Sequence, residues 1–312
     1  MTNSTVVTGG NTLGSVREVS DGVFAYVQPD GSWWINNTGF LVGKKGVFAI
    51  DASSTERRTK ALLSAIGRVT PQPVRTLVNT HHHGDHTHGN YLFADATIVG
   101  HEKCRSEILA AGLPSSAPTW TDVDWGAIEL APPVLTYEDR INLYVDDLRC
   151  EVRYVGSPAH TTNDSIVWIP ERSTLFCGDL LFQGGTPFLL MGSIAGAAEV
   201  LRELKKLNAE TIIPGHGEVC DSSLIDYVLG YLGFVEDLAR TGMAAGLSPL
   251  ETALDADLGD YGELLDAERI VGNLHRAFAE LNGAERGAAI DTAAAFADMV
   301  RFNGGKPLTC HA

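Results

Sequence analysis

The sequence predicts an α/β protein in which two β-sheets lie between layers of helices and a helical extension follows at the C-terminal end. Strand-like and helix-like segments alternate as far as Ile213. Polar motifs follow the ends of several strands, and from Ser222 onward the apolar residues repeat only at helical spacing. With 312 residues, of which 44% are hydrophobic, the chain can bury a large core.

The opening segments predict β-hairpins. Residues 16–19 and 23–28 are short strands separated by the turn Ser20-Asp21-Gly22. Residues 39–42 and 47–50 form a second pair around a Gly-Lys-Lys-Gly turn. A helix is then expected over residues 55–68, with Asp51-Ala52-Ser53-Ser54 as its capping segment.

The C-terminal part predicts several helices. The first is indicated by the apolar repeat Leu224, Tyr227, Val228, Tyr231, Leu232 and Val235. Further helices are expected over residues 248–257, 263–282 and 291–302. Because no Pro/Gly/Ser linker precedes them, we expect a metal-binding domain over residues 1–220 and an extension over 221–312 that packs on it near the active-site mouth.

The run from Asn79 to His86 has the pattern H-x-H-x-D-H and follows a predicted strand over residues 74–78. Residues two apart in an extended segment point to the same side, so His81 and His83 can bind one ion. The turn at Gly84 directs Asp85 and His86 toward a second ion.

Three further candidate ligands also follow strand-like segments. His160 comes after residues 150–155, and His216 comes after residues 211–213. Asp179 follows residues 173–176, and its two carboxylate oxygens can bridge two ions. Imidazole and carboxylate ligands favour two Zn²⁺ ions, with Fe or Mn as alternatives.

With this order of motifs, the chain resembles the metallo-β-lactamase superfamily. The resemblance implies a four-layer αββα sandwich, with His81, His83 and His160 on the first metal. It places Asp85, His86 and His216 on the second metal, with Asp179 bridging the two. The competing interpretation is a surface histidine tract, but four spaced motifs in this order argue against it.

Two divalent ions over one water molecule lower the pKa of that water and favour attack on acyl carbons. Asp85 is the candidate catalytic residue, because it can orient the nucleophile or pass a proton to the leaving group. Hydrolysis of an ester, thioester or lactam is the expected reaction class.

Four longer segments, residues 123–133, 185–193, 264–277 and 302–310, look like the actinorhodin-type cyclase/thioesterases of aromatic polyketide biosynthesis. This resemblance implies a later-ring aldol cyclisation and dehydration, together with release of the product from an acyl carrier protein thioester. A general hydrolase of small thioesters or lactones, similar to glyoxalase II or the lactonases, is the alternative within the enzyme class. A metal-stabilised binding protein without chemistry is the alternative outside it.

Candidate substrate-binding residues surround the motifs. Trp33 and Trp34 precede a segment where the superfamily often has a flap, and Thr186, Pro187, Phe188 and Met191 follow the bridging aspartate. His275 would reach the pocket if the tail covered its mouth. Core or helix packing is the competing interpretation for each of these side chains.

Charge and composition restrict the partners. The formal charge of −16 disfavours nucleic acid, and no apolar run approaches the roughly 18 residues that span a membrane. The polar start of the chain and five scattered cysteines favour a cytoplasmic protein with reduced thiols. The expected partner is a polyketide substrate, free or on an acyl carrier protein that could dock on Arg57-Arg58-Thr59-Lys60, and a homo-oligomer is compatible with the sequence.

Overall fold

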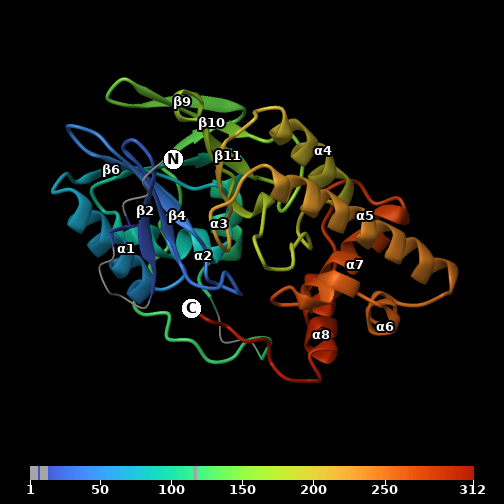
Figure 1. The fold of residues 1–312 in the computed structure, drawn as a ribbon. Coiled ribbons are helices and arrows are strands. Elements are labelled where there is room, and N and C mark those ends of the chain that lie inside the picture. Colours follow the sequence, from blue (N-terminus) through green and yellow to red (C-terminus); the bar gives the residue numbers. More distant parts are fainter. Residues whose placement is uncertain (1–5, 8–12, 115–117) are drawn as a thin grey trace.

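The computed structural model describes residues 6–7, 13–114 and 118–312, and most of the polar start of the chain lies outside this part. Two β-sheets face each other, with helices on both outer sides (Figure 1). The first sheet follows chain order: β1 (Val6–Val7), β2 (Ser15–Ser20), β3 (Val23–Val27), β4 (Thr38–Val42), β5 (Val47–Ile50), β6 (Val74–Val78), β7 (Thr97–His101) and β8 (Leu135–Tyr137). It is antiparallel from β1 to β5 and parallel from β5 to β8.

The second sheet has the order β13-β12-β11-β10-β9. Its strands are β9 (Arg140–Val145), β10 (Leu148–Tyr154), β11 (Ser165–Ile169), β12 (Thr174–Phe176) and β13 (Thr211–Ile213). β12 and β13 are parallel, and the other pairs are antiparallel. The parallel pairs β5–β6 and β12–β13 bring the chain out of both sheets at one edge, where the candidate ligands follow.

The helices are α1 (Glu56–Val69), α2 (Gly84–Thr87), α3 (Glu102–Ala111), α4 (Ile194–Lys205), α5 (Ser223–Ala244), α6 (Pro249–Asp255), α7 (Arg269–Leu281) and α8 (Thr292–Phe302). Short 3₁₀ turns lie at η1 (His88–Leu92), η2 (Pro170–Arg172), η3 (Gly178–Leu180) and η4 (Gly259–Glu263). In this part of the chain, no helix is both long enough and apolar enough to cross a membrane.

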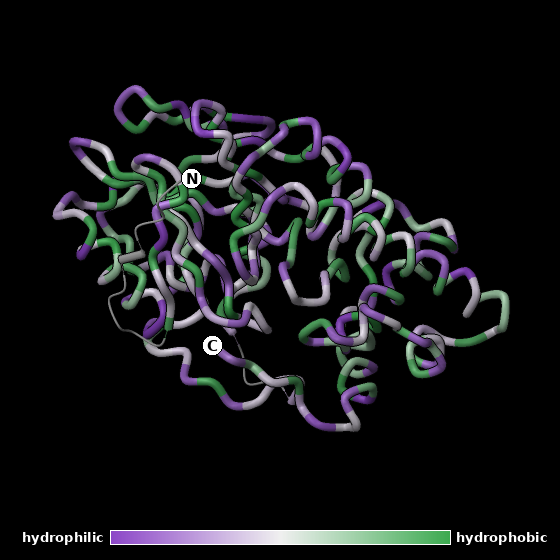
Figure 2. The backbone as a smooth tube through the Cα atoms, viewed as in Figure 1, coloured by the Kyte–Doolittle hydropathy of each residue, from purple (hydrophilic) through white to green (hydrophobic). Residues whose placement is uncertain are grey.

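Three hydrophobic layers hold the sandwich together. One lies between the sheets and contains Leu41, Val78, Val152 and Ile169. A second lies between the first sheet and α1, which contributes Leu62 and Ile66. The third covers the outer face of the second sheet with α4, α5 and α7. Hydrophobic residues gather along the buried strands in Figure 2. The four-layer αββα prediction is therefore confirmed.

Two predicted elements differ from the structure. Helix α1 is capped by Thr55, whose Oγ1 accepts a hydrogen bond from the Arg58 backbone at 3.3 Å, so the predicted cap 51–54 is wrong. The helix predicted over residues 263–282 begins only at Arg269. Leu265 instead forms a bridge to Gly185, and Asp266 has a φ of 56° that breaks the helical path.

The end of the chain returns from α8 to the first sheet. The Leu308 amide donates to the Thr119 carbonyl at 2.7 Å, and Arg58 donates to the His311 carbonyl at 2.6 Å. The His311 amide donates to the Trp33 carbonyl at 3.3 Å. The tail is thus tied to the segment that carries the paired tryptophans, while the domain boundary at residue 220 stays a prediction.

Candidate metal centre

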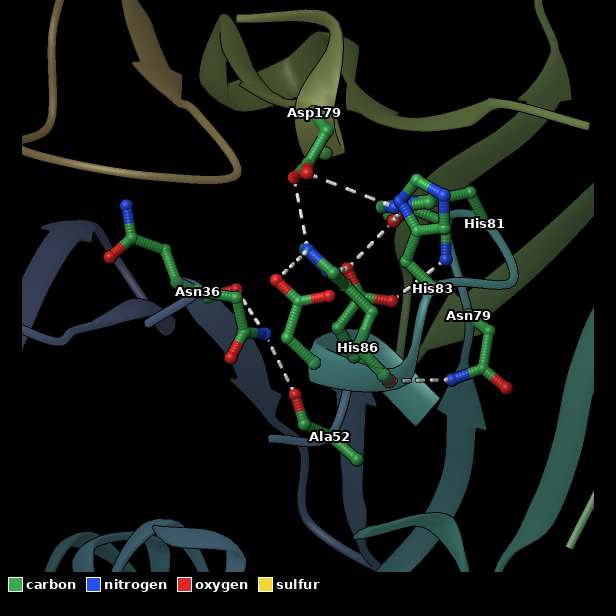
Figure 3. Close-up of polar contacts among 12 residues, drawn as sticks. Asn36, Ala52, Asn79, His81, His83, His86 and Asp179 are labelled. Atoms are coloured by element: carbon green, nitrogen blue, oxygen red, sulfur yellow. Dashed lines mark hydrogen bonds and ion pairs between the residues drawn. The ribbon is translucent and has the colours of Figure 1, made fainter. Parts of the chain in front are cut away.

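The seven predicted ligands come from loops at one edge of the two sheets. His81 and His83 follow β6, and Asp85 and His86 lie in α2. The other three follow strands of the second sheet: His160 after β10, Asp179 after β12 and His216 after β13. In Figure 3 the imidazoles of His81 and His86 point toward the carboxylate of Asp179.

The side chains form two groups that share one aspartate. His81, His83, His160 and Asp179 form the first group, and Asp85, His86, Asp179 and His216 form the second. Within each group, one nitrogen or oxygen atom per residue lies within 4.8 Å of the others. These are the two sets that the sequence predicts, and their assignment as ligands stays a prediction.

The spacing of these atoms suits divalent ions. Asp179 Oδ2 lies 3.8 Å from His81 Nε2 and 3.3 Å from His160 Nε2. Asp179 Oδ1 lies 2.9 Å from His86 Nε2, and His216 Nε2 lies 3.3 Å from Asp85 Oδ2. Ligand atoms about 2.0–2.2 Å from one ion in tetrahedral geometry lie about 3.3–3.6 Å apart. Each group can therefore surround one ion without a large movement.

Unpaired nitrogen atoms give a second test of the fit. The Nε2 atoms of His81 and His83 are buried and have no hydrogen-bond partner among the described residues, and His86 Nε2 faces only the carboxylates of the cluster. A buried polar atom without a partner is costly unless a ligand satisfies it. Imidazole nitrogen and carboxylate oxygen suit zinc, and iron or manganese are compatible with the same donors.

Four of the five imidazoles have their other nitrogen fixed by the protein. The Nδ1 contacts are His81 with Thr80 Oγ1 at 3.0 Å, His86 with Asp51 Oδ2 at 2.9 Å, His216 with the Gly31 carbonyl at 3.0 Å, and His160 with the Phe188 carbonyl. A proton held on Nδ1 leaves the Nε2 lone pair free for an ion. His83 differs, because its Nδ1 lies 2.9 Å from His160 Nε2, inside the first group.

Asp51 is a functional residue that the sequence prediction missed. Its Oδ1 accepts from the Thr80 backbone at 2.8 Å, and its Oδ2 accepts from Thr80 Oγ1 at 2.8 Å. Oδ2 also contacts His86 Nδ1, so one buried carboxylate orients parts of both groups. The available signal was its position directly after strand β5, the same context as the other site residues.

The buried imidazoles and carboxylates of the cluster shift one another's pKa values. Burial holds the pKa of His81 and His83 well below the usual value. Burial alone would also lower the pKa of His216, but the carboxylates of Asp179 and Asp85 raise it to about 9. Burial opposes ionisation of Asp179, yet the surrounding imidazoles hold its pKa well below the usual range. The site therefore favours ionised carboxylates, as ion binding requires.

Gly215 allows the bridging carboxylate to approach the loop after β13. A Cβ atom at this position would lie 1.9 Å from Asp179 Oδ1 and 2.7 Å from the Gly178 carbonyl carbon. Neither is the far end of a flexible chain, so a larger residue must displace the centre. The glycine before His216 is a steric requirement of the site.

A pocket with aromatic walls opens onto this cluster. Its floor contains His83, Asp85, His160, Asp179 and His216. Its walls contain Trp33, Trp34, Trp120, Phe182, Phe188, Met191, Arg269 and Phe296. Aromatic side chains present flat apolar faces, so the pocket suits a flat apolar group.

The predicted pocket residues divide into two sets. Trp33, Trp34, Phe188 and Met191 line the pocket. Thr186 and Pro187 do not: their backbone carbonyls accept hydrogen bonds from Arg269 at 3.0 Å and from Asn273 at 2.7 Å. His275 does not line the pocket either, because its Nε2 contacts Asp298 Oδ2 at 2.9 Å between α7 and α8.

The sequence prediction missed Trp120, Phe182, Arg269 and Phe296. Trp120 lies far along the chain from the ligands, and Arg269 and Phe296 belong to the tail, so no local motif links these three to the site. Phe182 was the one with a local signal, since it follows Asp179 closely. Its ring stacks on His216 with 5.0 Å between centroids.

Residues 31–216 match the model of the metallo-beta-lactamase superfamily, and the chain belongs to this family. The hydroxyacylglutathione hydrolase of Rhodospirillum rubrum is 33% identical over 137 residues, which cover 44% of this chain and 45% of that protein. The metallo-beta-lactamase type 2 of Bacillus cereus is 27% identical over 195 residues, which cover 60% of this chain and 69% of that protein.

Solved structures show the same fold. The metallo-beta-lactamase from Pontibacter korlensis has a TM-score of 0.60 and 20% identity, covering 70% of this chain and 99% of that one. The chain spans about half the length of the hydroxyacylglutathione hydrolases that it matches. These comparisons confirm the superfamily, and they leave the reaction and the substrate of this chain to proposal.

Proposed function

We propose that the chain hydrolyses thioesters or lactones whose acyl group is apolar and aromatic. The observation that carries this proposal is that the two ligand groups form the floor of a pocket with aromatic walls. Two divalent ions, when bound there, activate water and polarise an acyl carbonyl. The similar hydroxyacylglutathione hydrolases cleave an acylglutathione by name, which supports thioester hydrolysis as the reaction class.

Asp85 is the candidate proton carrier. Burial opposes its ionisation, but His86 and His216 together hold the pKa of its carboxyl below the usual range. The carboxylate lies at the pocket floor with Oδ2 3.3 Å from His216 Nε2. It can therefore accept a hydrogen bond from the attacking water and later pass a proton to the leaving group.

The walls favour an acyl group that is flat and uncharged over one that carries charges. Trp33 meets Trp120 and Phe188 edge to face, with 5.0 Å between centroids in each pair. Arg269 is the one cationic Lys or Arg side chain among the described residues that line the pocket, and it is paired with Asp266 at 2.8 Å. Glutathione carries two carboxylates that would lack free cationic partners there, which disfavours a glutathione thioester as the substrate.

The second candidate function is cyclisation of an aromatic polyketide with release of its carrier thioester. The observation that favours it is that the walls come from separate parts of the chain, including Phe296 of the tail, and can enclose a flexible substrate. Ring closure by aldol condensation requires a C–H beside a ketone to lose its proton. Asp85, which is ionised on the pocket floor, can orient the water that takes up this proton.

Carrier docking is the weakest part of the second candidate. In the segment 57–60, Arg58 is buried and bonded to Gln28 and His311, so it offers no charge to a partner. Lys60 is exposed but pairs with Glu56. Docking of an acyl carrier protein, a cytoplasmic location and a homo-oligomer stay predictions from the sequence.

A substrate panel tests the two candidates together. Zinc-loaded protein is assayed with N-acetylcysteamine thioesters of aryl-substituted acids, an acylglutathione, an aryl lactone and a bicyclic polyketide intermediate on its carrier protein. We expect hydrolysis of the aryl thioesters that a chelator abolishes and zinc restores. A new ring in the carrier-bound product supports the second candidate. Turnover of the acylglutathione alone would overturn both.

A further inference from the structure

We infer that the guanidinium of Arg269 is a substrate subsite that binds a ketone oxygen of the acyl group, farther along the acyl chain than the carbonyl under attack. The inference rests on the proposed hydrolysis of apolar thioesters, because it concerns the same pocket. It adds a polar recognition element to walls that are otherwise apolar, and so it narrows the substrate class to oxygen-bearing acyl groups.

Arg269 lies close to the candidate metal centre. Its Cζ lies 3.9 Å from the centroid of the Trp33 ring and 5.1 Å from that of Phe182. The Phe182 ring in turn stacks on His216, with 5.0 Å between centroids and 12° between planes. The guanidinium carbon is therefore within about 10 Å of a ligand imidazole, a span that the body of one acyl group can cover.

The guanidinium is held rigidly. Nη1 donates to the Thr186 carbonyl at 3.0 Å, and Nη2 pairs with Asp266 Oδ2 at 2.8 Å. Trp33, which packs against the guanidinium, is fixed by its own bond from Nε1 to Glu268 Oε1 at 2.7 Å. Only 1% of the Arg269 surface is exposed. A donor fixed in this way binds an oxygen with little loss of conformational freedom.

The guanidinium also has unused donors. An arginine carries five N–H groups, and two protein acceptors account for part of them here. The buried Nε has no acceptor among the residues that the structure describes. An unsatisfied buried donor is costly, and a ligand oxygen that met the guanidinium from the pocket that Arg269 lines would lower this cost.

Local charge indicates a neutral oxygen. The carboxylate of Asp266 neutralises the guanidinium, and the carboxylate of Glu268 accepts the hydrogen bond from Trp33 Nε1. A carboxylate or phosphate on the substrate would add negative charge to a region that already holds two acidic groups for one arginine. A ketone oxygen accepts hydrogen bonds without this repulsion.

Arg276 provides a matched control on the same helix. It is also 1% exposed, and its Nε and Nη2 donate to the Leu190 carbonyl at 3.1 and 2.8 Å. Its Nη1 likewise has no partner among the described residues, but Arg276 does not line the pocket. Replacing either arginine removes a buried cation and a bond to the 186–190 loop, and only one replacement removes the subsite.

The experiment compares two thioesters that differ by one ketone. The N-acetylcysteamine thioesters of 5-oxo-5-phenylpentanoic acid and 5-phenylpentanoic acid are assayed with zinc-loaded parent protein, Arg269→Met, Arg269→Lys and Arg276→Met. We expect the parent to prefer the ketone by about tenfold or more in kcat/KM, the size of one hydrogen bond to a charged group, chiefly through KM. Arg269→Met should bring the ratio close to one, Arg269→Lys should reduce it, and Arg276→Met should leave it unchanged.

A ratio of rates is insensitive to partial unfolding, because unfolded protein lowers both rates equally. A parent ratio near one, or an undiminished ratio in Arg269→Met, overturns the inference. Calorimetric binding of the two product acids gives a readout that needs no turnover. If neither thioester is hydrolysed but the keto acid binds about tenfold more tightly through Arg269, the proposed function falls and the subsite stands. If neither readout depends on Arg269, the subsite falls.

Discussion

Replacement of Asp51 by asparagine tests how the second group of ligands is oriented. Oδ1 of Asp51 accepts from the Thr80 backbone, which is a fixed donor, so the amide oxygen of the new side chain must take that position. The amide nitrogen then faces His86 Nδ1, which Asp51 Oδ2 contacts at 2.9 Å in the parent. An amide donor at Nδ1 forces the imidazole proton onto Nε2, the atom that faces the second group.

The magnitude follows from the role of the contact. Residues that orient a metal-binding histidine typically contribute 10- to 100-fold in metal affinity. That factor corresponds to about 1.4–2.7 kcal/mol, because each factor of ten is about 1.4 kcal/mol. Asp51→Asn keeps the volume of the side chain, so we expect this loss at the second ion with little change in the fold.

Calorimetric zinc titration of chelator-treated protein measures the effect, with the melting temperature before zinc addition as the control for folding. In the parent we expect two zinc-binding events of similar stoichiometry. In Asp51→Asn we expect one of these two events to be weaker. Thr80→Val is the companion variant. Thr80 Oγ1 contacts His81 Nδ1 at 3.0 Å, so this substitution should lower the affinity for the first ion more than that for the second. Two unchanged zinc affinities in Asp51→Asn would refute the reasoning.

Three further predictions concern the same centre. Gly215→Ala should abolish tight binding of the second ion, because the added Cβ would lie 1.9 Å from Asp179 Oδ1. The control is Gly233→Ala in α5, where an added Cβ meets no atom within 4 Å and should stabilise the helix by about 0.5–1 kcal/mol. Zinc titration and thermal melts measure both variants. Zinc affinity at the second group should rise with pH through about pH 9, because two of its imidazoles must lose a proton to bind: the carboxylates around His216 raise its pKa to about 9, and Asp179, Asp51 and Asp85 raise the pKa of His86 against the effect of burial. Proton release in buffers of different ionisation heat measures this. His83→Ala should lose hydrolysis while keeping its circular dichroism spectrum, and turnover at the parent rate would contradict a role in catalysis.

Local pattern was sufficient for most of the fold. The strand over residues 74–78 and the one over 47–50 were predicted with the bounds that the structure shows, because apolar runs between turn residues leave few alternatives. Helix α7 was predicted six residues too long at its start. The error arose because pairing of Leu265 with Gly185, 80 residues away, overrides local helical preference.

The grouping of the candidate ligands was predictable because their loops follow strands and each residue carries a chemically specific side chain. The lining of the pocket was less predictable, because Trp120 and Phe296 reach it only through tertiary packing. Asp51 shows a third case: its residue type and position were visible, but its partner Thr80 lies 29 residues away, and the same acidic residue also suits a helix cap. Chemistry that acts through neighbours in space leaves little trace in a single sequence.

Helix α7 connects the tail to the metal centre through one loop. Arg269, Asn273 and Arg276 share a face and donate to the carbonyls of successive parts of the 186–190 loop. Within that loop the Phe188 carbonyl holds His160 Nδ1, and the next amide, Leu189, donates to Asn273 Oδ1 at 2.8 Å. A displacement of α7 is therefore transmitted to a candidate ligand of the first ion through the Asn273 side chain and the backbone of Phe188 and Leu189.

The family match ends at His216, whereas Arg269 and Phe296 of the tail line the pocket. The part of the chain shared with the superfamily thus contains all seven candidate ligands, and the tail supplies pocket walls and loop contacts. Relatives that match only the shared part are informative about the reaction class and much less about the acyl group. Substrate specificity in this protein should accordingly respond to changes in α7 and α8 that leave both ion affinities intact.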